Sequence, residues 1–107
     1  NTFKLKTKAN VGVTTVGIYT APAATTTVVI GITLANTSGS GVNVGVGITR
    51  AGTTEDVKLL KNAPVPQGSS LEFMGGNKVV LEATDTVTVD SDTNNSIDAS
   101  LTIMEIT

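Results

Sequence analysis

Hydrophobic side chains alternate with polar or small ones over two long stretches between Thr26 and Arg50. A period of two residues is typical of β-strands, because successive side chains point to opposite faces of a sheet. Each stretch therefore predicts a strand with one apolar inward face. The two inward faces consist of Val28, Ile30, Ile32 and Leu34, and of Val42, Val44, Val46 and Ile48.

The segment between these two strands, Asn36 to Gly41, consists of residues that favour or tolerate turns. We therefore expect the two strands to form one long β-hairpin. In this interpretation their inward faces make the middle of a β-sandwich, and the rest of the chain covers them.

Shorter alternating runs separated by turn residues continue along the chain, and no helical period extends over a useful length. In the last run, Ile97, Ala99, Leu101 and Ile103 share one face, and the shift of phase at 104–106 predicts either a bulge near Ile103 or cover on both faces. The pattern predicts an all-β chain folded as a single antiparallel β-sandwich over residues 1–107, of immunoglobulin-like or jelly-roll topology, with about eight or nine short strands. Further strands are expected over residues 1–8, 10–20 (two short strands or one bent near residue 14), 57–62, 69–74, 78–81 and 86–90, with a tight turn at 75–77.

The first eight residues form a basic strand or arm. Phe3 and Leu5 alternate there with Lys4, Lys6 and Lys8, which predicts a half-buried strand with a basic outer face. One interpretation is an arm that docks on an acidic partner, and these five residues are then the candidate interface. The other is that the lysines protect an exposed sheet edge against wrong pairing.

Two glycines, Gly45 and Gly47, lie on the face opposite Val44 and Val46. Glycine weakens a strand unless something packs closely against it. Two readings remain open: the backbone of a neighbouring subunit lies on that face, or the glycines only allow local twist on a solvent-exposed face.

Composition narrows the function classes. The net charge is −2, which does not favour general attraction to nucleic acid, and the sequence contains no Cys and no His. No apolar run approaches the ~20 residues that span a bilayer, so we expect no membrane partner. No residue set specifies a catalytic reaction, and we expect neither an enzyme nor a cofactor. The sequence begins at Asn1 without a methionine, which is compatible with residues preceding it.

Only three aromatic residues are present, so the core must rest on many small aliphatic contacts. Such a core is only marginally stable, and contacts within an oligomer would add to it.

The candidate metal site is the acidic segment Asp90–Asp98. Its first residues, Asp90, Asp92 and Asn94, follow the spacing of an EF-hand calcium loop, but Asn95 replaces the turn glycine and Leu101 the bidentate glutamate. Two interpretations stay open: a polar loop at the tip of a hairpin, and a calcium site of another construction that includes Asp85 or Asp98.

Four segments of the chain resemble a known family. They are IYTAPAATTTVVIGITL (18–34), LLKNAPVPQGSSL (59–71), KVVLEATD (78–85) and LTIMEI (101–106). They are similar to small virion proteins of tailed bacteriophages, cyanophages in particular. The chain departs from the family pattern at Thr84, where the family usually has glycine before the corner Asp85.

The resemblance implies a small β-sandwich subunit of a virion, assembled in the host cytoplasm. It suggests a capsid decoration (cement) protein, a homotrimer that bridges subunits of the major capsid protein and stabilises the head passively. The alternatives are a neck, tail or baseplate component and, from another class, a carbohydrate- or receptor-binding module. The last usually presents exposed Trp or Tyr, and this chain has no Trp and one Tyr.

Overall fold

The computed structural model describes residues 1–73 and 78–107 and contains strands, turns and loops there, with no helix. The expected all-β architecture is confirmed. The strands are β1 (Thr2–Val11), β2 (Val16–Thr20), β3 (Thr26–Asn36), β4 (Val42–Arg50), β5 (Glu55–Val65), β6 (Ser70–Phe73), β7 (Val79–Leu81), β8 (Thr86–Ser91) and β9 (Ile97–Ile106).

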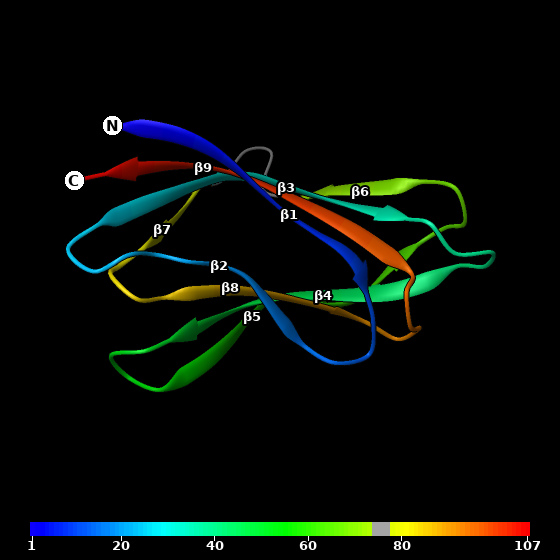
Figure 1. Ribbon diagram of the computed structural model, residues 1–107. Helices are drawn as coiled ribbons and strands as arrows, with labels where there is room; N and C mark the ends of the chain where they lie inside the picture. Colours follow the sequence, from blue (N-terminus) through cyan, green and yellow to red (C-terminus); the bar gives the residue numbers. More distant parts are fainter. Residues whose placement is uncertain (74–77) are drawn as a thin grey trace.

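The strands form two antiparallel sheets that pack face to face (Figure 1). Sheet A has the order β1-β9-β3, and both β6 and β7 pair with the far side of β3. Sheet B has the order β2-β8-β4-β5. In Figure 1 sheet A lies above sheet B, and both chain termini lie at the same end of sheet A.

The topology is that of a jelly roll. β6 pairs with Ile32–Ala35 and β7 with Thr27–Val29, so the two short strands occupy one strand position in succession. The pairings β1–β9, β2–β8, β3 with β6 and β7, and β4–β5 are then nested, like one long hairpin rolled into two sheets. Of the two topologies expected from the sequence, the strand order therefore matches the jelly roll and not the immunoglobulin-like fold.

The prediction of one long hairpin from Thr26 to Arg50 is wrong. β3 belongs to sheet A and β4 to sheet B, so the segment between them crosses from one sheet to the other. Asn36 fixes this crossing, because its side-chain amide donates hydrogen bonds to the carbonyl oxygens of Ser40 (2.8 Å) and Val65 (2.9 Å). The apolar faces of β3 and β4 meet across the core, and their backbones do not pair.

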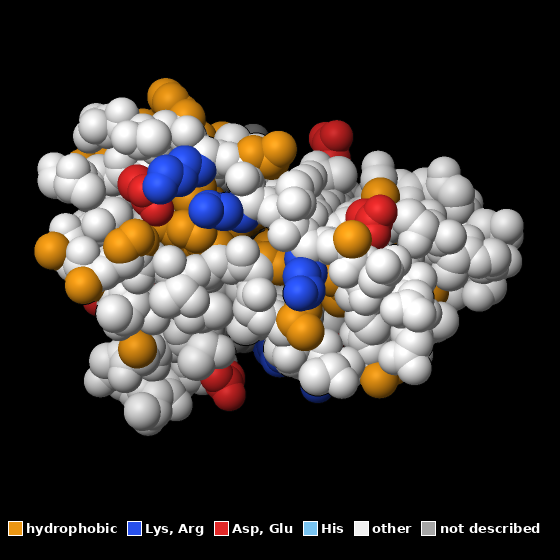
Figure 2. Space-filling model, in the orientation of Figure 1, with side chains coloured by type: hydrophobic (Ala, Val, Ile, Leu, Met, Phe, Trp, Pro, Cys, Tyr) orange, Lys and Arg blue, Asp and Glu red, His pale blue; other side chains and the backbone are white. Residues whose placement is uncertain are grey.

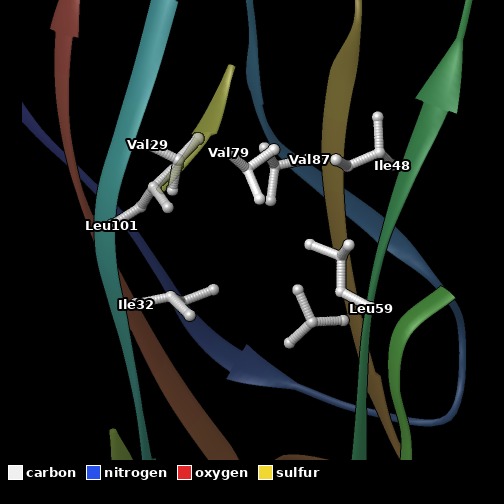
Figure 3. A pocket seen from close by; sticks show the side chains of 8 residues that line it. Val29, Ile32, Ile48, Leu59, Val79, Val87 and Leu101 are labelled. Atoms are coloured by element: carbon white, nitrogen blue, oxygen red, sulfur yellow. The ribbon is translucent and has the colours of Figure 1, made fainter. Parts of the chain in front are cut away.

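The core lies between the sheets and is built from small aliphatic side chains, as expected. The inward faces predicted for β4 and β9 are confirmed and buried: Val42, Val44, Val46 and Ile48, and Ile97, Ala99, Leu101 and Ile103. At its centre remains a small apolar cavity of about 10 Å³, between Ile32, Leu59 and Val87 (Figure 3). That is roughly the space of one water molecule, so it is a packing defect and no ligand site.

A β-bulge in β3 changes which of its side chains are buried. The register with β9 shifts between Val29 and Gly31, opposite Ile103. Beyond the shift Ile32 and Leu34 point inward as expected, but before it Thr27 and Val29 are buried in place of Val28 and Ile30. The prediction of one continuous inward face was therefore wrong for its first half.

The bulge expected near Ile103 is not in β9, which alternates regularly from Ile97 to Ile106. The partner strand β3 carries it. Two further expectations lie outside the described residues: the tight turn at 75–77 and the inward side chain of Phe73. Leu71, expected to point inward beside Phe73, is half-buried against the core.

Candidate interaction surface

The outer face of sheet A carries an apolar row that crosses four strands. Phe3 of β1 pairs with Met104 of β9, Met104 with Val28 of β3, and Val28 with Val80 of β7. Directly paired residues point to the same face of a sheet. Because Ile103 and Glu105 are buried on the inner face, these four side chains all face outward.

Neighbouring residues widen this row into a patch. Leu5 of β1 and Ile106 of β9 lie on the same outward face, next to the row. Among the described residues, six large hydrophobic side chains are exposed, and four of them lie here: Phe3 (69%), Leu5 (65%), Val80 (58%) and Ile106 (36%). We call the six residues Phe3, Leu5, Val28, Val80, Met104 and Ile106 the outer patch of sheet A. Figure 2 shows hydrophobic side chains along the upper margin, over this sheet.

The lysines of β1 point the other way, and the expected basic outer face was wrong. Lys4, Lys6 and Lys8 pair with Ile103, Leu101 and Ala99, the inward face of β9. They therefore lie on the side of β1 that faces the level of sheet B, and Phe3 and Leu5 are exposed where half-burial was expected. β1 is an edge strand of sheet A, so lysine can stand there without a buried charge. That these residues bind another chain stays a prediction.

A polar cluster lies directly behind the outer patch. The hydroxyl of Tyr19 donates a hydrogen bond to Oε2 of Glu105 (2.6 Å) and shares one with the hydroxyl of Thr27 (2.8 Å). Lys4 contacts the other oxygen of Glu105 at 2.9 Å. Burial and the bond to Glu105 raise the pKa of Tyr19 to about 12. Hydrogen bonds from Tyr19 and Lys4 lower the pKa of Glu105. This cluster joins β1, β2, β3 and β9.

The opposite edge of the sandwich, between β5 and β7, carries a surface pocket of about 180 Å³. Ile48, Val57, Val80 and Leu81 make its apolar part, and Arg50, Glu82 and Asp85 its charged part. We call it the β5/β7 pocket. No sequence pattern pointed to it, because its residues come from three separate segments.

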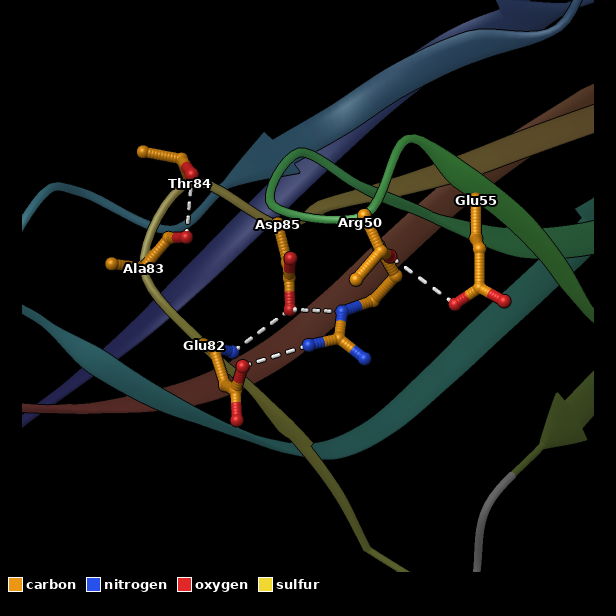
Figure 4. Close-up of polar contacts among 7 residues, drawn as sticks. Arg50, Glu55, Glu82, Ala83, Thr84 and Asp85 are labelled. Carbon is orange, nitrogen blue, oxygen red and sulfur yellow. Dashed lines mark hydrogen bonds and ion pairs between the residues drawn. The ribbon is translucent and has the colours of Figure 1, made fainter.

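Charges in this pocket are arranged around the single arginine (Figure 4). Arg50 Nε lies 3.0 Å from Oδ2 of the buried Asp85, and its Nη2 lies 2.7 Å from Oε1 of Glu82. The pairing with Asp85 raises the pKa of Arg50, with smaller contributions from Glu82 and Glu55. The pocket lining thus holds one cation and two carboxylates, and β5 at the same edge also carries Lys58 and Lys61.

The corner that supplies Glu82 and Asp85 contains Thr84 in an unusual backbone conformation. Thr84 has a φ of +69°, the left-handed region that favours glycine. The corner keeps its shape because Thr84 donates its backbone N–H to Ala21 O (2.9 Å) and Asp85 donates its own to Glu82 O (3.1 Å). Threonine therefore occupies a position where glycine would be unstrained.

The outer face of sheet B is polar and is covered by its own chain. A Cβ at Gly45 would lie 2.5 Å from Oδ1 of Asp90, and one at Gly47 would lie 2.9 Å from the carbonyl oxygen of Val57 and 3.2 Å from the hydroxyl of Thr88. The two glycines do face outward, as expected. The space over them is filled by side chains and backbone of this same chain. One of the two interpretations of the sequence had placed the backbone of a neighbouring subunit there.

The acidic residues of the 90–98 segment bind separate parts of the loop end. Asp90 accepts a hydrogen bond from the Thr15 hydroxyl (2.9 Å), and Asp98 from the Asn10 backbone N–H (3.0 Å). Within residues 1–73 and 78–107, no three acidic, His or Cys side chains gather into a metal-binding group. The carboxylates act here as loop-fixing acceptors.

Comparisons with known proteins show the fold. The chain matches no protein-family model and no curated protein sequence. Among solved structures it is similar to a protein of the Bacillus endospore appendages, described as disulfide-linked pili: 20% identity, TM-score 0.52, covering 99% of this chain and 88% of that one. It is also similar to a chain of the T13 IBDV viral particle: 12% identity, TM-score 0.57, covering 95% of this chain and 30% of that one. Among the described residues there is no apolar helix of membrane-spanning length.

Proposed function

We propose that this chain is a structural subunit of a larger protein assembly and joins its neighbours through the outer patch of sheet A. The apolar row from Phe3 through Met104 and Val28 to Val80 carries this proposal. An antiparallel sheet normally turns a polar face to water. A contiguous exposed apolar patch is typical of a surface that binds another protein.

The energy available from this patch suits a passive structural role. Fully burying one Phe, Leu, Ile or Val side chain contributes about 1.5–3 kcal/mol. Phe3, Leu5, Val80 and Ile106 are all exposed enough to contribute. The binding needs no chemistry, because the assembly gains stability from the area that it buries.

The specific assembly that we propose is a bacteriophage head, on which the chain is a decoration protein. The resemblance of residues 18–34, 59–71, 78–85 and 101–106 to small phage virion proteins supports this, and so does a fold shared with part of a viral particle chain. The partners would be further copies of the chain, in a homotrimer, and the major capsid protein. A neck, tail or baseplate position is the alternative within the same particle.

A subunit of a pilus-like filament is the second candidate. The likeness to the spore-appendage protein extends over nearly the whole of both chains, which favours it. Those pili are described as disulfide-linked. These 107 residues contain no Cys, so a filament of this chain would have to be held by non-covalent contacts alone.

Copy number in purified particles tests the proposal. Quantitative mass spectrometry of the virus that encodes the chain, referenced to its major capsid protein, gives the ratio. A simple fraction near one copy per capsid subunit is the expected result for decoration. A few per cent would move the protein to the neck, tail or baseplate. Absence from the particle would overturn the virion assignment.

A further inference from the structure

We propose that the partner of β1 is a second copy of this chain, and that copies join head to tail, the β1 edge of one against the β5/β7 edge of the next. This deepens the proposed function, on which it rests. Three independent observations on the two edges carry it.

The strand directions at the two edges of sheet A match. β1 runs antiparallel to β9, β9 to β3, and β3 to β7. β1 and β7 therefore run antiparallel to each other. A copy placed beside the first in the plane of sheet A thus brings its β7 next to β1 in the antiparallel sense that strands use to pair.

The apolar row continues across such a contact. Phe3 stands at one end of the row and Val80 at the other, on the same outward face. Both are largely exposed, so each edge leaves an apolar side chain in water when the chain is alone. Side-by-side placement brings Phe3 of one copy toward Val80 of the next.

Charge disfavours the alternative in which two β1 edges meet. Lys4, Lys6 and Lys8 lie on the side of β1 that faces the level of sheet B. Two β1 strands side by side would bring lysines against lysines, which is unfavourable. The head-to-tail contact avoids this, because the β5/β7 edge carries charges of both signs, with Arg50 between Glu82 and Asp85.

A head-to-tail contact uses two different surfaces and can repeat. If the rotation between copies closes, a ring such as a trimer results, and otherwise an open filament forms. Both outcomes share one property: a copy with a damaged β1 still offers an intact β5/β7 edge, and the reverse also holds. This property separates the proposal from a two-fold dimer.

The experiment uses one variant for each edge. Phe3→Asp disables the β1 edge, Val80→Asp disables the β5/β7 edge, and Val13→Asp is the matched control, because Val13 is exposed outside both edges. All three positions are exposed, so the variants should fold, which circular dichroism checks. Light scattering after size-exclusion chromatography then measures the mass of each variant alone and of the 1:1 mixture, up to about 1 mM protein, where weak contacts still register.

We expect wild type and Val13→Asp to assemble and each edge variant to be monomeric, with association weakened at least tenfold. The mixture of Phe3→Asp with Val80→Asp should give a 1:1 heterodimer that grows no further. A mixture that stays monomeric would overturn the head-to-tail arrangement, as would a wild type that is monomeric throughout or edge variants that assemble normally.

Failure here is distinguishable from failure of the proposed function. A protein that is monomeric in solution yet present in purified particles at a simple ratio to the capsid protein would lose the head-to-tail contact and keep its structural role. A protein that forms the mixed heterodimer but is absent from particles would lose the virion assignment and keep the contact.

Discussion

The outer faces of the two sheets differ although both belong to amphipathic antiparallel sheets. On sheet B, Asp90 and Thr88 lie over the glycines of β4, and the space against the backbone is filled from within the chain. On sheet A, Phe3, Leu5 and Val80 stand exposed, and no described side chain of this chain buries them. The outer face of sheet B is filled against its backbone within the monomer. The outer face of sheet A leaves hydrophobic side chains exposed, which a second chain would cover.

This difference separates two kinds of sensitivity to mutation. A change on the outer face of sheet B disturbs contacts inside the chain and should lower the free energy of unfolding. A change at an exposed residue of the outer patch of sheet A, such as Phe3 or Leu5, removes few contacts within the chain and should mainly lower the affinity between chains. The predictions below run from the largest expected effect to the smallest.

Gly47→Val should give the largest loss of stability. Valine is otherwise favourable in strands, but here its Cβ would meet the Val57 carbonyl oxygen at 2.9 Å. Forcing a side chain into filled space typically costs about 1–3 kcal/mol and occasionally more, and because the obstacle here is backbone we expect a loss of about 3 kcal/mol or more. Urea denaturation monitored by circular dichroism measures the change. A variant as stable as wild type would show that sheet B is not closed as described.

Leu5→Asp should have the opposite pattern: it should weaken association between chains and leave the stability of the single chain almost unchanged. Leu5 is exposed on the outer patch, so the free energy of unfolding should change by no more than about 0.5 kcal/mol. Association should weaken at least tenfold, measured by sedimentation velocity. Thr20→Asp, at an exposed position of sheet B, is the matched control and should assemble normally. Equal effects of the two substitutions on association would remove the distinction between the faces.

Tyr19→Phe tests the polar cluster behind the patch. The substitution removes the hydroxyl that donates to Glu105 and contacts Thr27, and it keeps the ring. Losing a buried hydrogen bond to a charged group costs roughly 1.5–3 kcal/mol. Thermal unfolding should show a lower midpoint. An unchanged midpoint would mean that Lys4 alone satisfies Glu105 and that the Tyr19 hydroxyl adds nothing.

The same cluster predicts how stability depends on pH. The pKa of Tyr19 is raised to about 12, so the folded state holds this proton longer, and its contribution to stability is lost as pH rises from about 10 to about 12. The pKa of Glu105 is lowered, so its contribution is present above the usual glutamate range and is lost as pH falls below that range. Unfolding curves across pH should lose the alkaline decline in Tyr19→Phe. A decline that persists unchanged in this variant would assign it to other groups.

Thr84→Gly should give the smallest effect, a gain. Threonine holds a φ of +69° there, which costs roughly 1–2 kcal/mol, and glycine removes that strain but adds entropy to the unfolded chain. We expect a net gain of less than about 1 kcal/mol in chemical denaturation, with Ala83→Gly as a control that should not stabilise. A loss of stability would show that the threonine side chain supports the corner.

Alternation along the sequence predicted the strands well where one face is buried and the backbone is regular. β4, β8 and β9 have the expected inward residues, because every second side chain reaches the core. The prediction of the inward face of β3 was wrong in its first half because the strand is apolar at consecutive positions. The sequence pattern therefore fitted either set of alternate residues equally well. Only pairing with β9 places the bulge after Val29 and decides the phase. The prediction of a hairpin was wrong because a short polar segment can join strands of different sheets as readily as strands of one sheet.

Of the six residues of the outer patch, the sequence analysis named only Phe3 and Leu5 as candidate interface residues, and it placed them on the wrong side of β1. Phe3 and Leu5 were expected to be buried because hydrophobic side chains usually face the core, but at this edge of sheet A the inward side is open and the lysines occupy it. Val28, Val80, Met104 and Ile106 were missed as surface residues. The only signal was the shift of phase at 104–106, which one of its two readings attributed to cover on both faces.

The most direct test of the central claim compares the two faces in the assembled protein. Hydroxyl-radical footprinting with mass spectrometry, on assembled and dissociated wild type, labels exposed side chains on both. We predict that Phe3, Leu5 and Val80 become protected on assembly, and that Lys58 on sheet B and the loop residue Val13 are labelled equally in both states. Protection of Lys58 with continued labelling of Phe3, Leu5 and Val80 would contradict the assignment of the interface to sheet A.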